Sequence, residues 1–270
     1  MPTAPTLVAF AEVDAPANTG VNITSASLSW ETGDVITVFP MTPGATDGEV
    51  INAPTTTGSG VSFGAAQQQH NSTGTDCGIG CWSAVATQNS SGTFSFNYTR
   101  VGATNRNIGM IVAISRGSGG IGNSVIYLGA TPNGASLTPG STNSMILWAI
   151  ADWAAAATVA LSPTSTSHNS TTPGPQAAPY SEQLSPDATY YGAVLDDQTS
   201  GSAASYGIAS GTGPFSIIAI EIEAQAGTPA DSGPNPAGAA ADLGGGSGSW
   251  TNPTNAQGTA NTTYAVWTAP

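Results

Sequence analysis

The chain has 270 residues but few charges: 3 Arg, no Lys and 16 Asp or Glu, with a formal net charge of −13. Nucleic acid and anionic membrane surfaces are both recognised through Lys and Arg clusters, so we expect neither as a partner. Leu, Ile, Val and Phe number only 45, a share that usually indicates disorder when the net charge is high. The composition alone therefore excludes two partner classes and leaves folding as the first question.

The apolar residues are concentrated in short runs, and 43 of the 45 lie before residue 226. Short runs rich in β-branched and aromatic residues, bounded by Gly, Pro, Asn and Ser, are typical of strands. In chain order these runs are VNITSASLSW, GDVITVFP, VSFGA, CWSAVAT, TFSFNYTRV, IGMIVAIS, NSVIYLG, SMILWAI, TYYGAVL, SYGIAS and FSIIAIEIE. No run has the period of a long amphipathic helix; only DWAAAATVAL, from Asp152, could form a helical turn or two. The pattern predicts an all-β fold, an antiparallel jelly-roll-like β-sandwich.

Two of these runs predict which side chains face the core. In TFSFNYTRV the alternation places Phe94, Phe96 and Tyr98 on one face of a half-buried strand. In FSIIAIEIE it places Ile218, Ile220 and Ile222 on one face, with Ala219, Glu221 and Glu223 on an outward face. Ser, Thr and Asn on the outward faces would keep such a sandwich soluble with little charge.

The composition changes sharply after residue 225, and we divide the chain there. The sandwich is expected over 1–225, a Gly-, Pro- and Ala-rich flexible linker over 226–249, and a docking segment over 250–270. Aromatic residues beyond a linker seldom stay exposed without a partner, so the last segment is expected to pack on the domain or on another chain. Its candidate docking residues are Trp250, Asn252, Pro253, Asn255, Tyr264 and Trp267.

The two cysteines, Cys77 and Cys81, lie in the sequence CGIGC. They are too few for a disulfide scaffold, and a local Cys77–Cys81 disulfide remains one alternative, because Gly78 and Gly80 bend easily. Together with His70 they would give three zinc ligands at spacings that match no common zinc site. We therefore expect no metal and no cofactor.

Candidate catalytic groups are sparse. Neither a G-x-S-x-G elbow nor H-E-x-x-H occurs, and both His70 and His168 lie in polar loop sequence. The acidic pairs Glu221/Glu223 and Asp196/Asp197 could serve glycoside hydrolysis, but surface acids are the simpler interpretation. The prediction is that the chain is not an enzyme.

Aromatic side chains suggest one further kind of site. Trp82 and Trp148 lie inside apolar runs and are expected in the core. Tyr190 and Tyr191 point to opposite faces of their run, so one should face outward and could contact a glycan.

The order of the runs resembles a family. GDVITVF, CGIGCWSAVATQNSSG, IGMIVAISRGSGGIGNS, SMILWAIADWAAA and FSIIAIEIEAQ are similar to segments of the β-sandwich virion proteins of tailed phages infecting actinobacteria, often minor tail proteins. The segment WTNPTNAQGTANTTYAVW resembles a W-x-N-P-x-N-A motif of phage tail and fibre proteins. In those proteins the motif commonly opens a further β-domain, whereas here the sequence ends at Pro270.

The resemblance implies a non-enzymatic structural role in the virion, with assembly in the host cytoplasm. It implies contacts with other copies of the chain, as a homo-oligomer, and with other virion proteins. A minor tail component is the first expectation. Alternatives are a capsid decoration or head fibre protein and a module that binds a host-surface glycan.

Overall fold

The structure is a computed structural model that describes residues 3–15, 22–42, 50–72, 76–99, 108–152, 161–163, 180–184, 188–226, 249–251 and 266–268. The chain divides into two compact units: Thr3–Gln225, and a second unit made of Met1–Pro2 with Ala226–Pro270. Within the described ranges every regular element is a strand, and the strand pairs are antiparallel. The prediction of an all-β, antiparallel sandwich is confirmed.

The unit Thr3–Gln225 consists of two halves that meet at Gly117. The strands described in the first half are β1 (Thr6–Ala15), β2 (Asn22–Thr24), β3 (Leu28–Trp30), β4 (Val35–Thr42), β5 (Val50–Ile51), β6 (Thr55–Thr56), β7 (Gln68–His70), β8 (Gly78–Val85), β9 (Ser90–Gly92), β10 (Phe94–Thr99) and β11 (Ile108–Arg116). Those of the second half are β12 (Ser118–Gly129), β13 (Ala135–Leu137), β14 (Ser144–Asp152), β15 (Leu161–Ser162), β16 (Tyr180–Leu184), β17 (Ala188–Gln198), β18 (Ala204–Ile208) and β19 (Phe215–Ala224).

The two halves have the same strand order. The large sheet of the first half runs β1-β11-β4-β8-β7, and that of the second half runs β12-β19-β14-β17-β16. The small sheets, β2-β10-β5 and β13-β18-β15, correspond in the same way. In each half the first strand therefore lies beside the last, and the second strand pairs with the last but one. This repeat differs from the single sandwich that the sequence predicts over residues 1–225.

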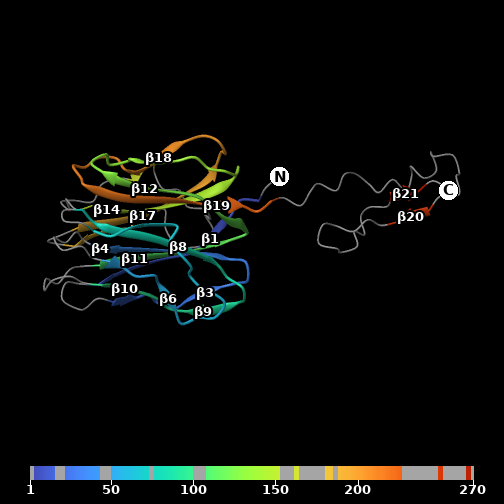
Figure 1. Cartoon of the computed structure of the whole chain (residues 1–270), viewed down its shortest axis with the longest axis horizontal. Helices are drawn as coiled ribbons and strands as arrows, with labels where there is room; N and C mark the ends of the chain where they lie inside the picture. Colours follow the sequence, from blue (N-terminus) through green and yellow to red (C-terminus); the bar gives the residue numbers. More distant parts are fainter. Residues whose placement is uncertain are drawn as a thin grey trace. The chain divides into compact units, whose positions relative to one another are not determined.

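The sheets stack in layers, which Figure 1 shows from β10 at one side to β18 at the other. One apolar cluster lies between the two large sheets and includes Phe39, Ile111 and Ile220. A second cluster lies between the first large sheet and its small sheet, and a third occupies the same position in the second half. The large sheets are thus covered on both faces.

This layering explains which burial predictions hold. In β10, Phe94, Phe96 and Tyr98 are buried and alternate with more exposed residues, as predicted. Trp82 and Trp148 are in the core, also as predicted. The outward placement of Ala219 and Glu221 is wrong, because the small sheet of the second half covers that face of β19 and both residues are fully buried.

The two large sheets face each other with their strand orders reversed. Edge strand β7 lies against edge strand β12, where Gln68 donates a hydrogen bond of 3.0 Å to the hydroxyl of Ser124. At the other end, the Phe10 ring of β1 lies over Gly192 of β17. In the interior, Ser216 Oγ donates a buried hydrogen bond of 2.6 Å to the carbonyl of Cys77. Polar as well as apolar contacts therefore join the two halves.

In the second unit, β20 (Ser249–Thr251) and β21 (Val266–Thr268) pair antiparallel, with Trp250 opposite Trp267. The other four candidate docking residues, Asn252, Pro253, Asn255 and Tyr264, lie outside the described residues. Among the described residues, no helix long and apolar enough to cross a membrane is found.

Candidate functional site

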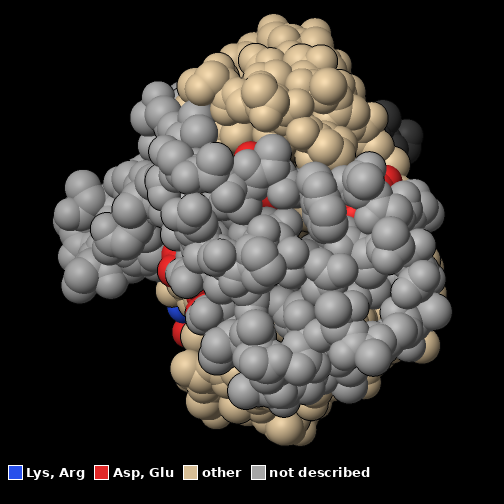
Figure 2. Space-filling view, turned by 90° about the vertical axis from the view of Figure 1, so that its left-hand side faces the viewer, with Lys and Arg blue, Asp and Glu red and all other residues tan. Residues whose placement is uncertain are grey.

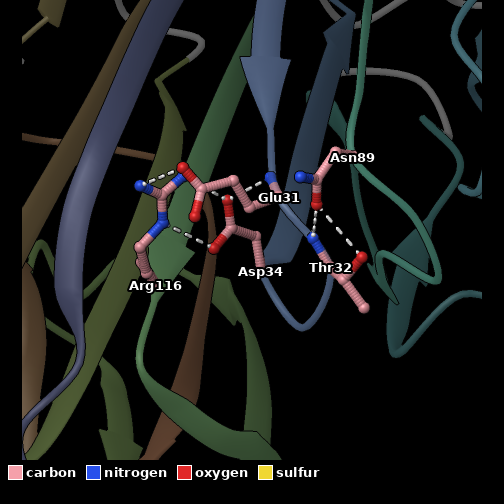
Figure 3. A network of polar contacts seen from close by, with 5 residues as sticks. All are labelled: Glu31, Thr32, Asp34, Asn89 and Arg116. Atoms are coloured by element: carbon pink, nitrogen blue, oxygen red, sulfur yellow. Dashed lines mark hydrogen bonds and ion pairs between the residues drawn. The ribbon is translucent and has the colours of Figure 1, made fainter.

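A network of polar contacts lies where the two halves join. There β11 ends at Arg116, Gly117 turns the chain with a φ of 70°, and β12 begins at Ser118. The run Gly117–Gly122 is thus a one-residue corner followed by strand. The turn between β3 and β4, residues 31–34, packs against this corner (Figure 3).

Asp34 is the centre of this junction corner. Its carboxylate is 1 % exposed and accepts hydrogen bonds from Arg116 Nε and Nη2, both at 3.0 Å. It also accepts the backbone N–H of Glu31 at 2.8 Å, which closes the turn. Gly33 occupies the turn with a φ of 89°, a conformation that costs glycine little. Because both oxygens of this buried carboxylate are paired, the ion pair fixes the position of Arg116 relative to the turn.

Arg116 completes the corner with a more exposed contact. Its Nη1 lies 2.9 Å from Oε1 of Glu31, a carboxylate that is 57 % exposed. The hydrogen bond to Asp34 raises the pKa of the Arg116 guanidinium further above its ordinary value. On the far side of the turn, Thr32 donates its N–H and its hydroxyl to Asn89 Oδ1 (Figure 3).

A shallow pocket of about 160 Å³ opens at the corner. It is lined by Glu31, Thr32, Gly33, Asp34, Arg116, Gly117, Ser118 and Gln225. Gln225 is the last residue of the large unit, so the turn, the junction of the halves and the point where the chain leaves the sandwich share one site. Figure 2 shows one face of the molecule, on which a small blue patch lies beside red ones and a few further red patches interrupt a described surface that is otherwise tan.

Sequence reasoning missed both Asp34 and Arg116. A signal was available, since Arg116 is a cation that directly follows the apolar run IGMIVAIS, and Asp34 closes a turn-like E-T-G-D. An isolated charge at the end of a buried strand usually requires a counter-ion. Which of the acids would supply it depends on the strand pairing.

A second polar site surrounds Glu221 of β19, which was a candidate hydrolytic acid. Its carboxylate accepts backbone N–H groups from Gly140 at 2.8 Å, Ser141 at 2.9 Å and Asn123 at 3.1 Å. Burial by itself would raise the pKa of this carboxyl, but the three N–H donors outweigh it and hold the pKa below its ordinary value. Glu221 therefore stays ionised and fixes the loop between β13 and β14.

Two other candidate hydrolytic acids, Glu223 and Asp196, have side chains that the structure describes. Glu223 is half-buried on the same strand as Glu221, and Asp196 belongs to β17. Nearby, burial first and the charge of Glu221 second raise the pKa of Tyr206 to about 12. The side chain of Asp197 lies outside the described residues.

Tyr190 and Tyr191 are both fully buried, so the prediction that one of them faces a glycan is wrong. Tyr190 belongs to the cluster between the large sheets and Tyr191 to the cluster under the small sheet. The sheet that contains β17 is covered on both faces. Tyr190 and Tyr191 point to opposite faces of this sheet, and each of these faces is buried.

The remaining candidates lie around β7 and β8. Cys77 and Cys81 are both buried and are not bonded to each other. They lie four residues apart along nearly extended chain, so their Cα atoms are separated by about 13 Å, whereas a disulfide needs Cα atoms within about 7 Å.

His70, expected in a solvated loop, lies in β7, and its Nε2 is 2.8 Å from Asp76 Oδ2. Among the described residues no cluster of three metal-ligating side chains is found.

No protein-family model matches this chain, and comparison with curated proteins and with solved structures found no significant match. The junction corner fixes the turn 31–34 against the end of β11, directly before Gly117, where the two halves are joined. Its charged groups are paired with each other, and it lies beside Gln225, the last residue of the large unit.

Proposed function

We propose that the chain is a non-enzymatic structural protein of a tailed-phage virion, most simply a minor tail component. The observation that carries the proposal is the repeated strand order. In each half, the order of the large and small sheets is that of a jelly roll, an architecture found in viral capsid proteins and lectins. Jelly rolls serve several functions, and the resemblance of the apolar runs to phage virion proteins favours a virion role among them.

The arrangement of the ends also supports a role in assembly. Thr3 pairs with Gln225, so the large unit is closed and the chain leaves it at the junction corner. The segment that follows is rich in Gly, Pro and Ala. Its last part contains three aromatic residues, Trp250, Tyr264 and Trp267. A closed body followed by such a segment fits a subunit that docks on neighbouring virion proteins through its arm.

Deletion of residues 227–270 tests this role. The truncated protein should fold, because no strand of the large unit is removed, but it should fail to enter particles when it replaces the full chain in an infected host. Particles are purified and the protein is quantified by mass spectrometry. Normal incorporation of the truncated protein would contradict an arm-mediated docking role.

A further inference from the structure

The outer edge of β8 contains a gap in its hydrogen bonding. The segment 57–67, between β6 and β7, runs along this edge. At one end Gln67 N–H donates to the carbonyl of Cys81 at 2.9 Å, and at the other Thr87 N–H donates to the carbonyl of Gly60 at 2.8 Å. Between them the Gln67 side chain acts as a strand residue: its Oε1 accepts the Ser83 N–H at 2.6 Å, and its Nε2 donates to the Ser83 carbonyl at 3.4 Å.

Val85 lies on this edge between Ser83 and Thr87, two residues that are hydrogen-bonded to segment 57–67. Ala86 exchanges hydrogen bonds with the turn on the inner side, through Asp34 and Gly33. Backbone groups alternate in direction along an antiparallel strand, so the N–H and C=O of Val85 point outward, as those of Ser83 do. Among the described residues, no side-chain or loop hydrogen bond to these two groups is found.

A hollow of about 290 Å³ lies at this gap, and we call it the Val85 hollow. It is lined by Gly60, Val61, Ser62, Val85 and Thr87, and none of these is charged. The Val85 side chain is 46 % exposed, one of the most exposed large apolar side chains of the described surface. The hollow therefore offers one donor, one acceptor and an apolar wall, with no counter-charge for an ion.

The geometry restricts what can bind there. A donor and an acceptor that point the same way are matched by a primary carboxamide or by one residue of an extended peptide. Gln67 already provides a carboxamide of this kind to Ser83, two residues away on the same edge. An uncharged peptide rich in Asn and Gln is therefore the chemistry that fits.

We propose that the Val85 hollow binds the C-terminal segment 249–268 of a second copy of the chain. This segment has no charged residue and contains Asn252, Asn255, Gln257 and Asn261 within ten positions. Its aromatic and apolar residues would contact the wall formed by Val61 and Val85. The inference depends on the proposed function for the choice of a neighbouring copy, since a many-copy assembly needs its arms to bind between subunits.

Photo-crosslinking of the full chain tests this inference. Ser62→p-benzoylphenylalanine places the photoreactive group on the rim of the hollow, and Ser136→p-benzoylphenylalanine, at an exposed serine of β13, is the matched control. Copies grown in ¹⁴N and ¹⁵N media are mixed before irradiation, and crosslinked peptides are identified by mass spectrometry. We expect crosslinks from position 62 to residues 249–268 as mixed-isotope pairs, and none from position 136.

A second variant replaces Asn252, Asn255, Gln257 and Asn261 with Ala, all outside the unit Thr3–Gln225. Loss of a paired carboxamide should lower the crosslinking yield about tenfold. Crosslinks only within one copy, crosslinks to other segments, an absence of crosslinks, or an unchanged yield in the Ala variant would each overturn the inference. The experiment uses the purified chain and needs no virion. If mixed-isotope crosslinks form but the protein is absent from particles, the contact between copies stands and the proposed function is refuted.

Discussion

Thr3 and Gln225 exchange two backbone hydrogen bonds, each of 3.0 Å, and so join the beginning of the large unit to its end. The residues on either side of this bridge belong to the other compact unit. The sandwich is thus closed by its own termini before the C-terminal segment begins.

The first prediction is that removal of residues 227–270 leaves the sandwich folded. Urea unfolding followed by Trp fluorescence should show one cooperative transition with a midpoint close to that of the full chain. The control is removal of residues 1–5, which breaks the Thr3 bridge and should lower the free energy of unfolding by about 1–2 kcal/mol. Loss of cooperative unfolding on C-terminal truncation would show that the segment is part of the core.

The second prediction concerns the junction corner. Arg116→Ala leaves the buried Asp34 carboxylate without its cation and should cost about 3 kcal/mol of stability. Glu31→Ala removes only an exposed partner of the same guanidinium, so its cost should be below about 1 kcal/mol. Equal costs for the two substitutions, measured by urea unfolding at pH 7, would contradict the assignment of Asp34 as the main partner.

The third prediction follows from the lowered pKa of Glu221. Because the folded-state pKa lies below the unfolded value of about 4.3, this group stabilises the fold at neutral pH. Its contribution declines as the pH falls below the unfolded value and through the folded one. Glu221→Gln should cost about 2 kcal/mol at pH 7, since an amide N–H₂ would face backbone donors, and should cost less near pH 3. A penalty that does not change between these pH values would show that the ionised form has no special role.

The fourth prediction tests the contact between the two large sheets. A Cβ added at Gly109 would lie 2.6 Å from the ring of Tyr190, so Gly109→Ala must displace that ring. The expected cost is about 1–3 kcal/mol. Gly64→Ala is the control, because a Cβ there has no neighbour within 4 Å. Similar thermal unfolding midpoints for the two variants would argue against close packing at this contact.

The alternation of residues predicted the half-buried strand β10 correctly, because only one face of its sheet meets the core. The same reasoning failed for Tyr191 and Glu221. Their strands are covered on both faces, and there alternation separates two cores rather than core from solvent. Runs such as GDVITVF indicated this difference. Val35, Ile36, Val38 and Phe39 place apolar side chains on both faces of the strand, as a strand covered on both faces requires.

The candidate site depended on information that short runs do not contain. The pairing of Arg116 with Asp34 joins residues 82 positions apart, and the backbone donors to Glu221 lie 80 to 98 positions away. Each isolated charge could have indicated that a partner exists. Only the register of the sheets determines which partner it is.

The proposed virion role is tested most directly by quantitative mass spectrometry of virus particles purified from the source in which the chain is expressed. We predict that the full-length protein is present in many copies per particle and remains bound through density-gradient purification. Its absence from purified particles, with the protein found only in the infected-cell lysate, would contradict a structural role in the virion.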